Sequence, residues 1–421
     1  MRSAKFKKLF ALLIIAAFGN QCASASLNDV KYAAVIYRHG DRTPVECYPT
    51  DPWRNESLWP VKFGQLTNTG KKQHFALGQW LRERYTHLLS TEFEPTELYV
   101  RSTDVDRTLM SAEANLAGMY PPSGNCVWDE HLRWQPIPVH TRPVKDDNVL
   151  AMEKPCTRYR IAYDEHIKSK EYVDRLHEYQ GLMQYLSAHT GEKVTDYNHI
   201  NNIYNVLYIE DLYNFTLPNW TQSVYPDKLL EPAGYSFTTN TALPILARLK
   251  VGPLLKLIVE QMVRTVEYEK TGKRKMEARV SIFSAHDITV ASVLNALHMF
   301  DGKCPSYTAT VLLELLHEKT ANNKTDSYFI RISYRNTIEI VEPKVLYIPY
   351  CGEKCPLDRF INLYTNLLTV DWQHECEKPP FKHYVHVSVA FAMILFYVFA
   401  ILRLRTTEYS DLNTESVSSE M

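Results

Sequence analysis

The pattern of apolar and polar residues predicts an α/β domain with a mixed sheet. Five short apolar runs are typical of buried strands: residues 31–37, 98–100, 278–283, 309–316 and 328–334. Segments with apolar residues at helical spacing lie between or after them, at about 69–89, 109–119, 253–269 and 287–297. Asn322-Asn323, between the last two apolar runs, indicates a hairpin turn. This order of elements is that of an α/β core with both parallel and antiparallel strands.

Residues from about 145 to 250 have a different character. They are rich in polar and aromatic residues, and none of their segments has a strong strand pattern. We therefore expect an α/β/α core domain at 26–380 that carries a smaller, mostly helical insertion, which would form a cap.

Both ends of the chain carry apolar segments of another kind. Basic residues, a short apolar run and small residues before position 26 are typical of a cleaved signal peptide at 1–25, with an uncleaved anchor as the alternative. The run at 385–402 is long enough to span a bilayer, and a buried core helix is the alternative. Two arginines follow this run at once, so that residues 403–421 would lie in the cytosol.

The tail at 403–421 is polar and contains Tyr409 and Leu412 at the spacing of an endocytic and lysosomal sorting signal. Such a signal would bind a clathrin adaptor as an extended strand. We therefore expect a single-pass protein of the lysosomal membrane with a lumenal domain, delivered directly or by way of the cell surface and endosomes.

A lumenal domain would be glycosylated and disulfide-bonded. Sequons occur at Asn55, Asn214, Asn219 and Asn323. Of the eight cysteines, Cys22 lies in the predicted leader, so an odd number remains and at least one would be free or intermolecular. Cys351 and Cys355 could close a tight loop; a zinc site is the weaker alternative, because zinc-finger spacing is missing.

Composition and charge narrow the function. The chain has 47 Lys+Arg against 48 Asp+Glu, which argues against a nucleic-acid partner. The apolar share of 45% and the charged share of 23% are ordinary for a globular protein and exclude wholesale disorder. Without a Walker A loop, HExxH or GxSxG, the sequence gives no support to a nucleoside triphosphatase, a zincin or a serine hydrolase.

Three polar clusters follow predicted strands, at residues 38–44, 101–107 and 284–287. In open α/β sheets the chemistry lies beyond the carboxyl ends of strands, so the clusters predict one active site. Guanidinium groups match phosphate oxygens, and several together predict a phosphate site. The candidate arginines are Arg38, Arg42, Arg101 and Arg107. The alternative is a structural network in which they pair with Asp41, Asp104 and Asp106.

The same clusters contain groups that could act on a phosphate ester. His39 could be a nucleophile, because neutral imidazole attacks well and a phosphorylated histidine can be hydrolysed. His286 could donate a hydrogen bond to a phosphoryl oxygen, and Asp287 could protonate the leaving oxygen. Asp287 could also N-cap the helix that follows.

These motifs resemble those of the histidine acid phosphatases. Residues 38–44 read RHGDRTP, which matches the family's RHGxRxP signature, and residues 284–287 match its HD signature. Further blocks at 59–67, 101–118, 134–141 and 214–220 look like the lysosomal and prostatic members, over about residues 31–376. The leader, span and tail fit the lysosomal members best and the membrane-anchored prostatic type second.

The resemblance implies the histidine phosphatase fold and hydrolysis of small phosphomonoesters at acid pH. His39 would form a phosphohistidine, and Asp287 would be the proton donor. Phosphate would be bound by Arg38, Arg42, Arg107 and His286. No metal or cofactor is expected, because the arginines supply the positive charge, and a homodimer is implied. A same-fold phosphatase for inositol polyphosphates or sugars and a non-catalytic membrane binding protein are the alternatives.

The resemblance also implies two disulfides, Cys156–Cys376 and Cys351–Cys355. A third family bridge is missing, since Ile209 and Thr310 stand at its positions. The resemblance leaves the pairing of three cysteines unassigned: Cys47, Cys126 and Cys304.

Overall fold

The computed structural model describes residues 27–272, 278–319, 326–377 and 391–402, and its centre is a mixed sheet. The sheet order is β2-β3-β1-β4-β5-β6, and β7 pairs with β5. The strands are β1 (Val30–Arg38), β2 (Leu98–Ser102), β3 (Val280–Ala285), β4 (Thr310–Lys319), β5 (Asp326–Arg335), β6 (Lys344–Val345) and β7 (Cys355–Pro356). β2, β3 and β1 are parallel, whereas β4 is antiparallel to β1 and β5 is antiparallel to β4. The predicted mixed sheet is confirmed.

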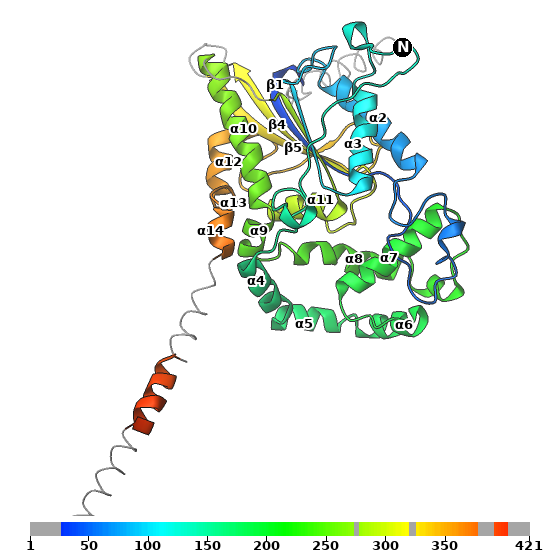
Figure 1. The fold of residues 1–421 in the computed structure, drawn as a ribbon, viewed down its shortest axis with the longest axis vertical. Helices are drawn as coiled ribbons and strands as arrows, with labels where there is room; N and C mark the ends of the chain where they lie inside the picture. The colour runs from blue at the N-terminus through cyan, green and yellow to red at the C-terminus, as the bar shows by residue number, and fades with distance from the viewer. Residues whose placement is uncertain (1–26, 273–277, 320–325, 378–390, 403–421) are drawn as a thin grey trace, which may run out of the picture.

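Helices cover both faces of this sheet (Figure 1). α2 (Asn68–Arg84) and α3 (Asp106–Met119) pack on one face. The helices on the other face are α9 (Pro244–Lys250), α10 (Gly252–Thr271), α11 (Asp287–Ala296), α12 (Leu357–Leu363) and α13 (Thr365–Leu368). Side chains of β1 alternate between the two layers: Ala34 and Ile36 join one core cluster, and Val35 and Tyr37 join the other. Burial on both faces explains why the strand reads as one continuous apolar run.

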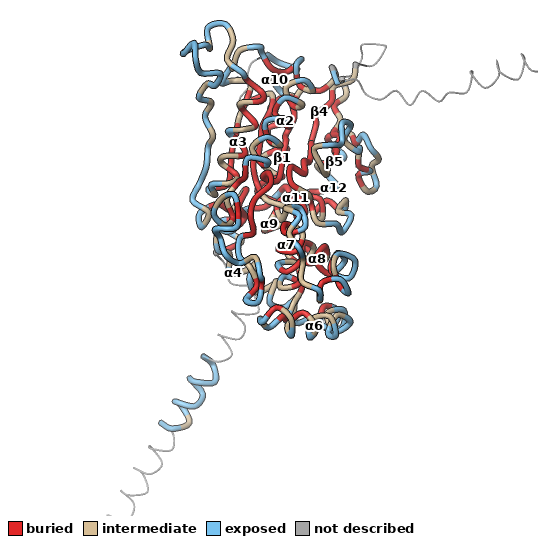
Figure 2. The backbone as a smooth tube through the Cα atoms, turned by 90° about the vertical axis from the view of Figure 1, so that its right-hand side faces the viewer, coloured by how far each residue is buried: buried red, intermediate tan, exposed pale blue. Residues whose placement is uncertain are grey.

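The inserted cap consists of helices α4 to α8. They are α4 (Thr157–Ile167), α5 (Lys170–His177), α6 (Gln180–Thr190), α7 (Tyr197–Leu212) and α8 (Asp227–Thr239). Residues 145–250 are all described and contain no strand. The cap has its own apolar cluster, in which Leu186 and Leu207 are fully buried and which Tyr48 joins from the loop after β1. The buried trace in Figure 2 is densest in the sheet and thins toward α4 to α6.

Disulfides join Cys156 to Cys376 and Cys351 to Cys355, the two pairs that the resemblance implied. The first bridge ties the start of α4 to α14 (Trp372–Glu377). Because Cys351 and Cys355 are bonded to each other, the zinc interpretation of these residues is wrong. The remaining described cysteines are free: Cys47, Cys126 and Cys304.

Several predicted features fall partly or wholly outside the described residues. Of the predicted span at 385–402, residues 391–402 are described and form a helix whose apolar side chains are mostly exposed. Among described residues, no helix combines the length and apolar character that a membrane crossing requires. The leader at 1–25, the hairpin turn at 322–323 with its sequon, and the tail with Tyr409 and Leu412 lie outside the description.

Candidate active site

The register of the parallel strands brings the polar clusters together. Arg38 at the end of β1 pairs with Ala285 of β3, and Ser102 at the end of β2 pairs with Ser284 of β3. The residues that follow are tied across the same edge, since the His39 amide donates to the Ala285 carbonyl at 3.0 Å. The three strands therefore bring the residues that follow them to one edge of the sheet, and the cap lies next to that edge, below the sheet in Figure 1.

The loop after β1 packs backbone against backbone on the start of α2. A Cβ on Gly40 would lie 2.4 Å from the Gly70 carbonyl oxygen, so only glycine fits there. This contact fixes the loop that carries His39.

His39 is held as a neutral imidazole with one free nitrogen. His39 is only 2% exposed. Its Nδ1 lies 2.8 Å from the Gly40 carbonyl oxygen, which can only accept, so Nδ1 carries the hydrogen and Nε2 keeps a lone pair. Burial, followed by the nearby guanidiniums of Arg38 and Arg107, holds the pKa of His39 well below its usual range. Such a nitrogen is available as a nucleophile at acid pH.

Three of the predicted arginines, Arg38, Arg42 and Arg107, act on His39 electrostatically. Within the described chain, the Nε of each is buried without a hydrogen-bond partner. Burial and the repulsion of Arg42 lower the pKa of Arg107 to about 10, so it stays charged at acid and neutral pH. Like charges with unused donors make a site that an anion would stabilise.

Arg38 is the most constrained of the three. It donates to the Pro305 carbonyl at 2.5 Å and forms an ion pair of 2.9 Å with Asp287. Its guanidinium carbon lies 4.4 Å from the ring centroid of Tyr307, and the Tyr307 hydroxyl donates to the Arg42 carbonyl at 3.3 Å. No motif pointed to Tyr307, because nothing in its local sequence reveals which strand end it approaches.

Asp287 is the first residue of α11, and His286 is the N-cap, so the alternative capping role for Asp287 is wrong. Burial acts to raise the pKa of Asp287, but Arg38, Arg42 and His286 outweigh it and the pKa is lowered. The carboxyl is therefore ionised in the unliganded site.

His286 stands beside His39, with 5.7 Å between the ring centroids. Burial, followed by Arg107, lowers the pKa of His286 to about 3, so the ring is neutral. Its Nε2 lies 3.0 Å from the Thr103 hydroxyl oxygen, a partner that the sequence motifs did not single out. The parallel register of β2 and β3 is the signal that could have found it.

Asp41 connects the nucleophile loop to the cap instead of pairing with an arginine. Its carboxylate accepts hydrogen bonds from Thr67 and, at 2.8 Å, from Tyr213, which follows α7. Asp104 and Asp106 are exposed, and neither forms an ion pair with an arginine within the described ranges. The alternative of a structural network built on these aspartates is therefore wrong.

Arg101 is a correction to the predicted set. It forms a buried ion pair of 2.5 Å with Asp147, whose carboxylate also accepts amide hydrogen bonds from residues 149–151. Arg101 lies within β2, so its side chain leaves from a face of the sheet and not from the strand end. It does not contribute to the anion site.

Three of the predicted sequon asparagines are described, and all are exposed: Asn55, Asn214 and Asn219. Among described residues, no group of three or more histidine, cysteine or acidic side chains is arranged to hold a metal ion.

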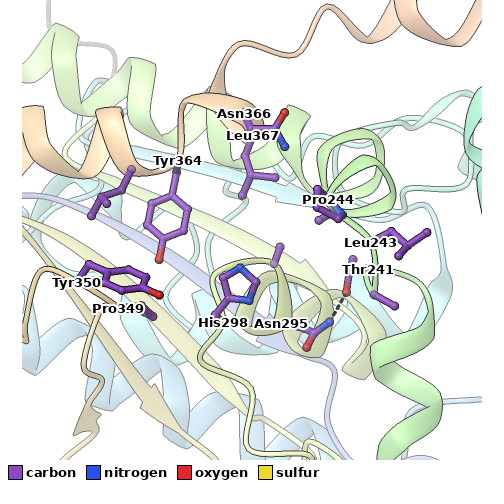
Figure 3. Close-up of a pocket in the computed structure, with 14 residues that line it drawn as sticks. Thr241, Leu243, Pro244, Asn295, His298, Pro349, Tyr350, Tyr364, Asn366 and Leu367 are labelled. Atoms are coloured by element: carbon purple, nitrogen blue, oxygen red, sulfur yellow. Dashed lines mark hydrogen bonds between the residues drawn. The ribbon is translucent and has the colours of Figure 1, made fainter. Parts of the chain in front are cut away.

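Two cavities lie outside the cluster of arginines and histidines. One, of about 300 Å³, borders it through Asp41 and Tyr307 and is also lined by Tyr208, Tyr213 and Glu339. The other, of about 300 Å³, is lined by residues such as Asn295, His298, Tyr350 and Tyr364 (Figure 3). It shares no residue with the arginine and histidine cluster and is not part of it.

The chain is similar to known proteins over most of its length. Residues 29–335 match the family described as the histidine phosphatase superfamily (branch 2). Human prostatic acid phosphatase is 38% identical over 84% of this chain and 89% of its own length. Lysosomal acid phosphatase of Xenopus laevis is 34% identical over 98% of this chain and 94% of its own. The phytase of Citrobacter braakii shares the fold, with a TM-score of 0.58, 19% identity, and coverage of 80% of this chain and 98% of that one.

Proposed function

Because the chain belongs to branch 2 of the histidine phosphatase superfamily, a hydrolytic family, we propose that it hydrolyses phosphate monoesters to an alcohol and inorganic phosphate at acid pH, through a phosphohistidine. The observation that carries this proposal is His39 itself. It is a neutral imidazole with a free Nε2, surrounded by three guanidiniums that have unused donors.

In the first half of the reaction, Nε2 of His39 attacks phosphorus while the bond to the leaving oxygen breaks. Arg38, Arg42 and Arg107 bind the phosphoryl oxygens, and their charge stabilises the transition state in a buried site. The Gly40 carbonyl accepts from Nδ1 and so stabilises the positive ring that forms.

Asp287 is our candidate for the proton donor. In the free protein its carboxylate is paired with Arg38. A bound phosphoryl group adds negative charge beside it and engages the same guanidinium, and both effects raise the pKa of Asp287 toward the range where it can hold a proton. Water then attacks the phosphohistidine, with Asp287 as the base.

The cavity beside Asp41 gives an argument about the leaving group. Its carboxylates, Asp41 and Glu339, face the space that borders the phosphate site. A densely phosphorylated leaving group would be repelled there, which favours small phosphomonoesters over inositol polyphosphates. The catalytic set also argues against a non-catalytic binding protein.

The same proposal extends to location. The relatives that bear the name lysosomal acid phosphatase, the apolar run at 385–402 and the tail with Tyr409 and Leu412 support a single-pass lysosomal membrane protein. Exposed Asn55, Asn214 and Asn219 are compatible with glycosylation of a lumenal domain. The clathrin adaptor and the homodimer stay predictions.

The test uses the full chain, made in eukaryotic cells and extracted in detergent. Hydrolysis of an aryl phosphate is measured at about pH 5 with EDTA present, for wild type, His39→Ala and the exposed control His177→Ala. We expect wild type and the control to turn over, and His39→Ala to lose about 10³-fold or more. An acid-labile phosphoprotein should form rapidly in wild type and in the control, and not in His39→Ala. Full activity of His39→Ala would refute the assignment of the nucleophile.

A further inference from the structure

Thr103 follows β2 and belongs to no role proposed so far. It is fully buried, and its amide donates to the Ser284 carbonyl at 3.1 Å, which holds it beside the end of β3. Its hydroxyl oxygen lies 3.0 Å from Nε2 of His286 and 2.7 Å from the hydroxyl oxygen of Thr108. A chain of three polar groups therefore runs from His286 to the first turn of α3.

The direction of the hydrogen bonds in this chain can be worked out. The Thr108 oxygen lies 2.7 Å from the Val105 carbonyl and 3.0 Å from the Thr103 carbonyl, and neither carbonyl can donate. A Thr108 hydrogen pointed at Thr103 would leave lone pairs facing lone pairs at both carbonyl contacts, so the hydrogen points toward a carbonyl. Its lone pairs then face Thr103, so the Thr103 hydroxyl donates to Thr108 and accepts from His286. Nε2 of His286 carries the hydrogen, and the neutral ring has an unprotonated Nδ1.

Nδ1 of His286 is thus a hydrogen-bond acceptor. Within the described part of the chain, the His286 ring makes its hydrogen bond through Nε2, to Thr103. The fully ionised phosphoryl oxygens are acceptors as well, so they would meet Nδ1 unfavourably. A singly protonated phosphoryl group carries a P–OH that can donate to it.

We propose that Thr103 is a positioning residue that fixes the tautomer of His286, and that the resulting Nδ1 acceptor selects phosphate monoesters in their singly protonated, monoanionic form. This inference rests on the proposed function, because it concerns the phosphate site.

A singly protonated ester would bring to the site a proton that the free site lacks. The ester ROPO₃H⁻ arrives with one proton, and Asp287 is ionised before binding. The P–Nε2 bond to His39 forms as the P–OR bond breaks, and the substrate's proton passes by way of Asp287 to the leaving oxygen. The products are ROH and a phosphohistidine with a positive ring and two phosphoryl charges. One negative charge and one transferable proton are conserved on both sides.

The charged and titratable groups that face His286 come from three elements. Arg38, Arg42 and His39 lie at and after the end of β1, Arg107 lies at the start of α3, and Asp287 starts α11. The arginines oppose protonation of the ring and Asp287 favours it. The arginines prevail, which keeps Nδ1 an acceptor in the free site.

The test is binding of inorganic phosphate by calorimetry from about pH 5 to pH 8, with the full chain in detergent. Thr103→Val removes the hydroxyl at nearly constant volume, and Thr103→Ser retains it. Thr265→Val is the matched control, because that buried hydroxyl donates only to its own helix in α10. In wild type the dissociation constant should rise by about tenfold per pH unit once the monoanion is depleted. Thr103→Val should bind about tenfold more weakly at pH 5 and show a flatter pH dependence. Thr103→Ser and Thr265→Val should match wild type.

An unchanged pH dependence in folded Thr103→Val would overturn the inference and leave the proposed function standing. Failure of wild type to bind phosphate would overturn both. Nitrogen NMR of labelled histidine in wild type, assigned with His286→Gln, needs neither turnover nor the valine variant. We expect a hydrogen on Nε2 of His286, and a hydrogen on Nδ1 would refute the inference.

Discussion

We predict that Glu210 and Asp51 share a proton in the folded protein. Glu210 of α7 is fully buried, and neither carboxyl oxygen has a partner among the described residues. Asp51, from the loop after β1, lies close enough to act on it electrostatically. One Asp51 oxygen accepts from the Trp53 amide at 2.7 Å, and the other is unpartnered. The polar neighbours Cys47 and Tyr48 bring no positive charge, so a proton shared between the two carboxyls would relieve their repulsion.

The pH dependence of the free energy of unfolding follows from the linkage between folding and proton binding. Burial and the Asp51 carboxylate raise the pKa of Glu210 to about 9, against roughly 4.3 in an unfolded chain. Between these values the folded protein holds one more proton than the unfolded chain. The free energy of unfolding is therefore highest at low pH and falls by up to about 1.4 kcal/mol per pH unit as pH rises. From about pH 5 to pH 7 this amounts to about 2.5 kcal/mol.

The perturbation is Glu210→Gln, which keeps the shape and donates to Asp51 without a titratable proton. Urea unfolding curves at about pH 5, 6 and 7 give the free energy of unfolding for wild type, for Glu210→Gln and for the exposed control Glu165→Gln on α4. We expect wild type and the control to lose about 2.5 kcal/mol more than Glu210→Gln over this range. A difference below about 0.5 kcal/mol would refute the shared proton.

Three further predictions concern the site and the scaffold. Asp287→Asn should lower kcat for an alkyl phosphate by about 10²–10⁴-fold and much less for an aryl phosphate with a good leaving group; equal losses for both substrates would argue against a proton donor. Gly40→Ala should destabilise the fold by more than about 3 kcal/mol, because its Cβ would meet the Gly70 carbonyl at 2.4 Å, and a thermal unfolding midpoint within about 2 °C of wild type would contradict this close approach. Cys156→Ser opens the bridge to Cys376, which spans 220 residues, and should cost about 2–5 kcal/mol in urea unfolding while activity before unfolding is retained.

The main strands were predictable because burial on both faces makes them continuous apolar runs. All five predicted runs correspond to β1 to β5. The two-residue strands β6 and β7 were missed, since so short a segment carries no period. The helix expected over 69–89 ends at Arg84, although Leu88 and Leu89 stay buried. The spacing of apolar residues indicates which side chains are buried, but it does not indicate where the helical backbone ends.

The site was predictable where chemistry follows a strand end and unpredictable where it depends on register. His39, Arg42 and His286 follow strands directly, and parallel strands end at one edge. Arg101 was misplaced because it lies inside its strand, where side chains alternate between faces. Tyr307 reaches the site through a contact that no local pattern encodes. Thr103 lies in a predicted cluster, but its contact with His286 depends on the register of β2 and β3.

The ion pair between Arg38 and Asp287 has a consequence for turnover. In the free protein, the carboxylate occupies one of the positions that a phosphoryl oxygen would take on this guanidinium, at 2.9 Å. In the proposed mechanism, Asp287 would thus compete with inorganic phosphate for Arg38, at a high local concentration. This competition would weaken the binding of the phosphate product by the arginines and speed its release. A cluster of three cations that would otherwise be inhibited by its own product can in this way release phosphate where phosphate accumulates.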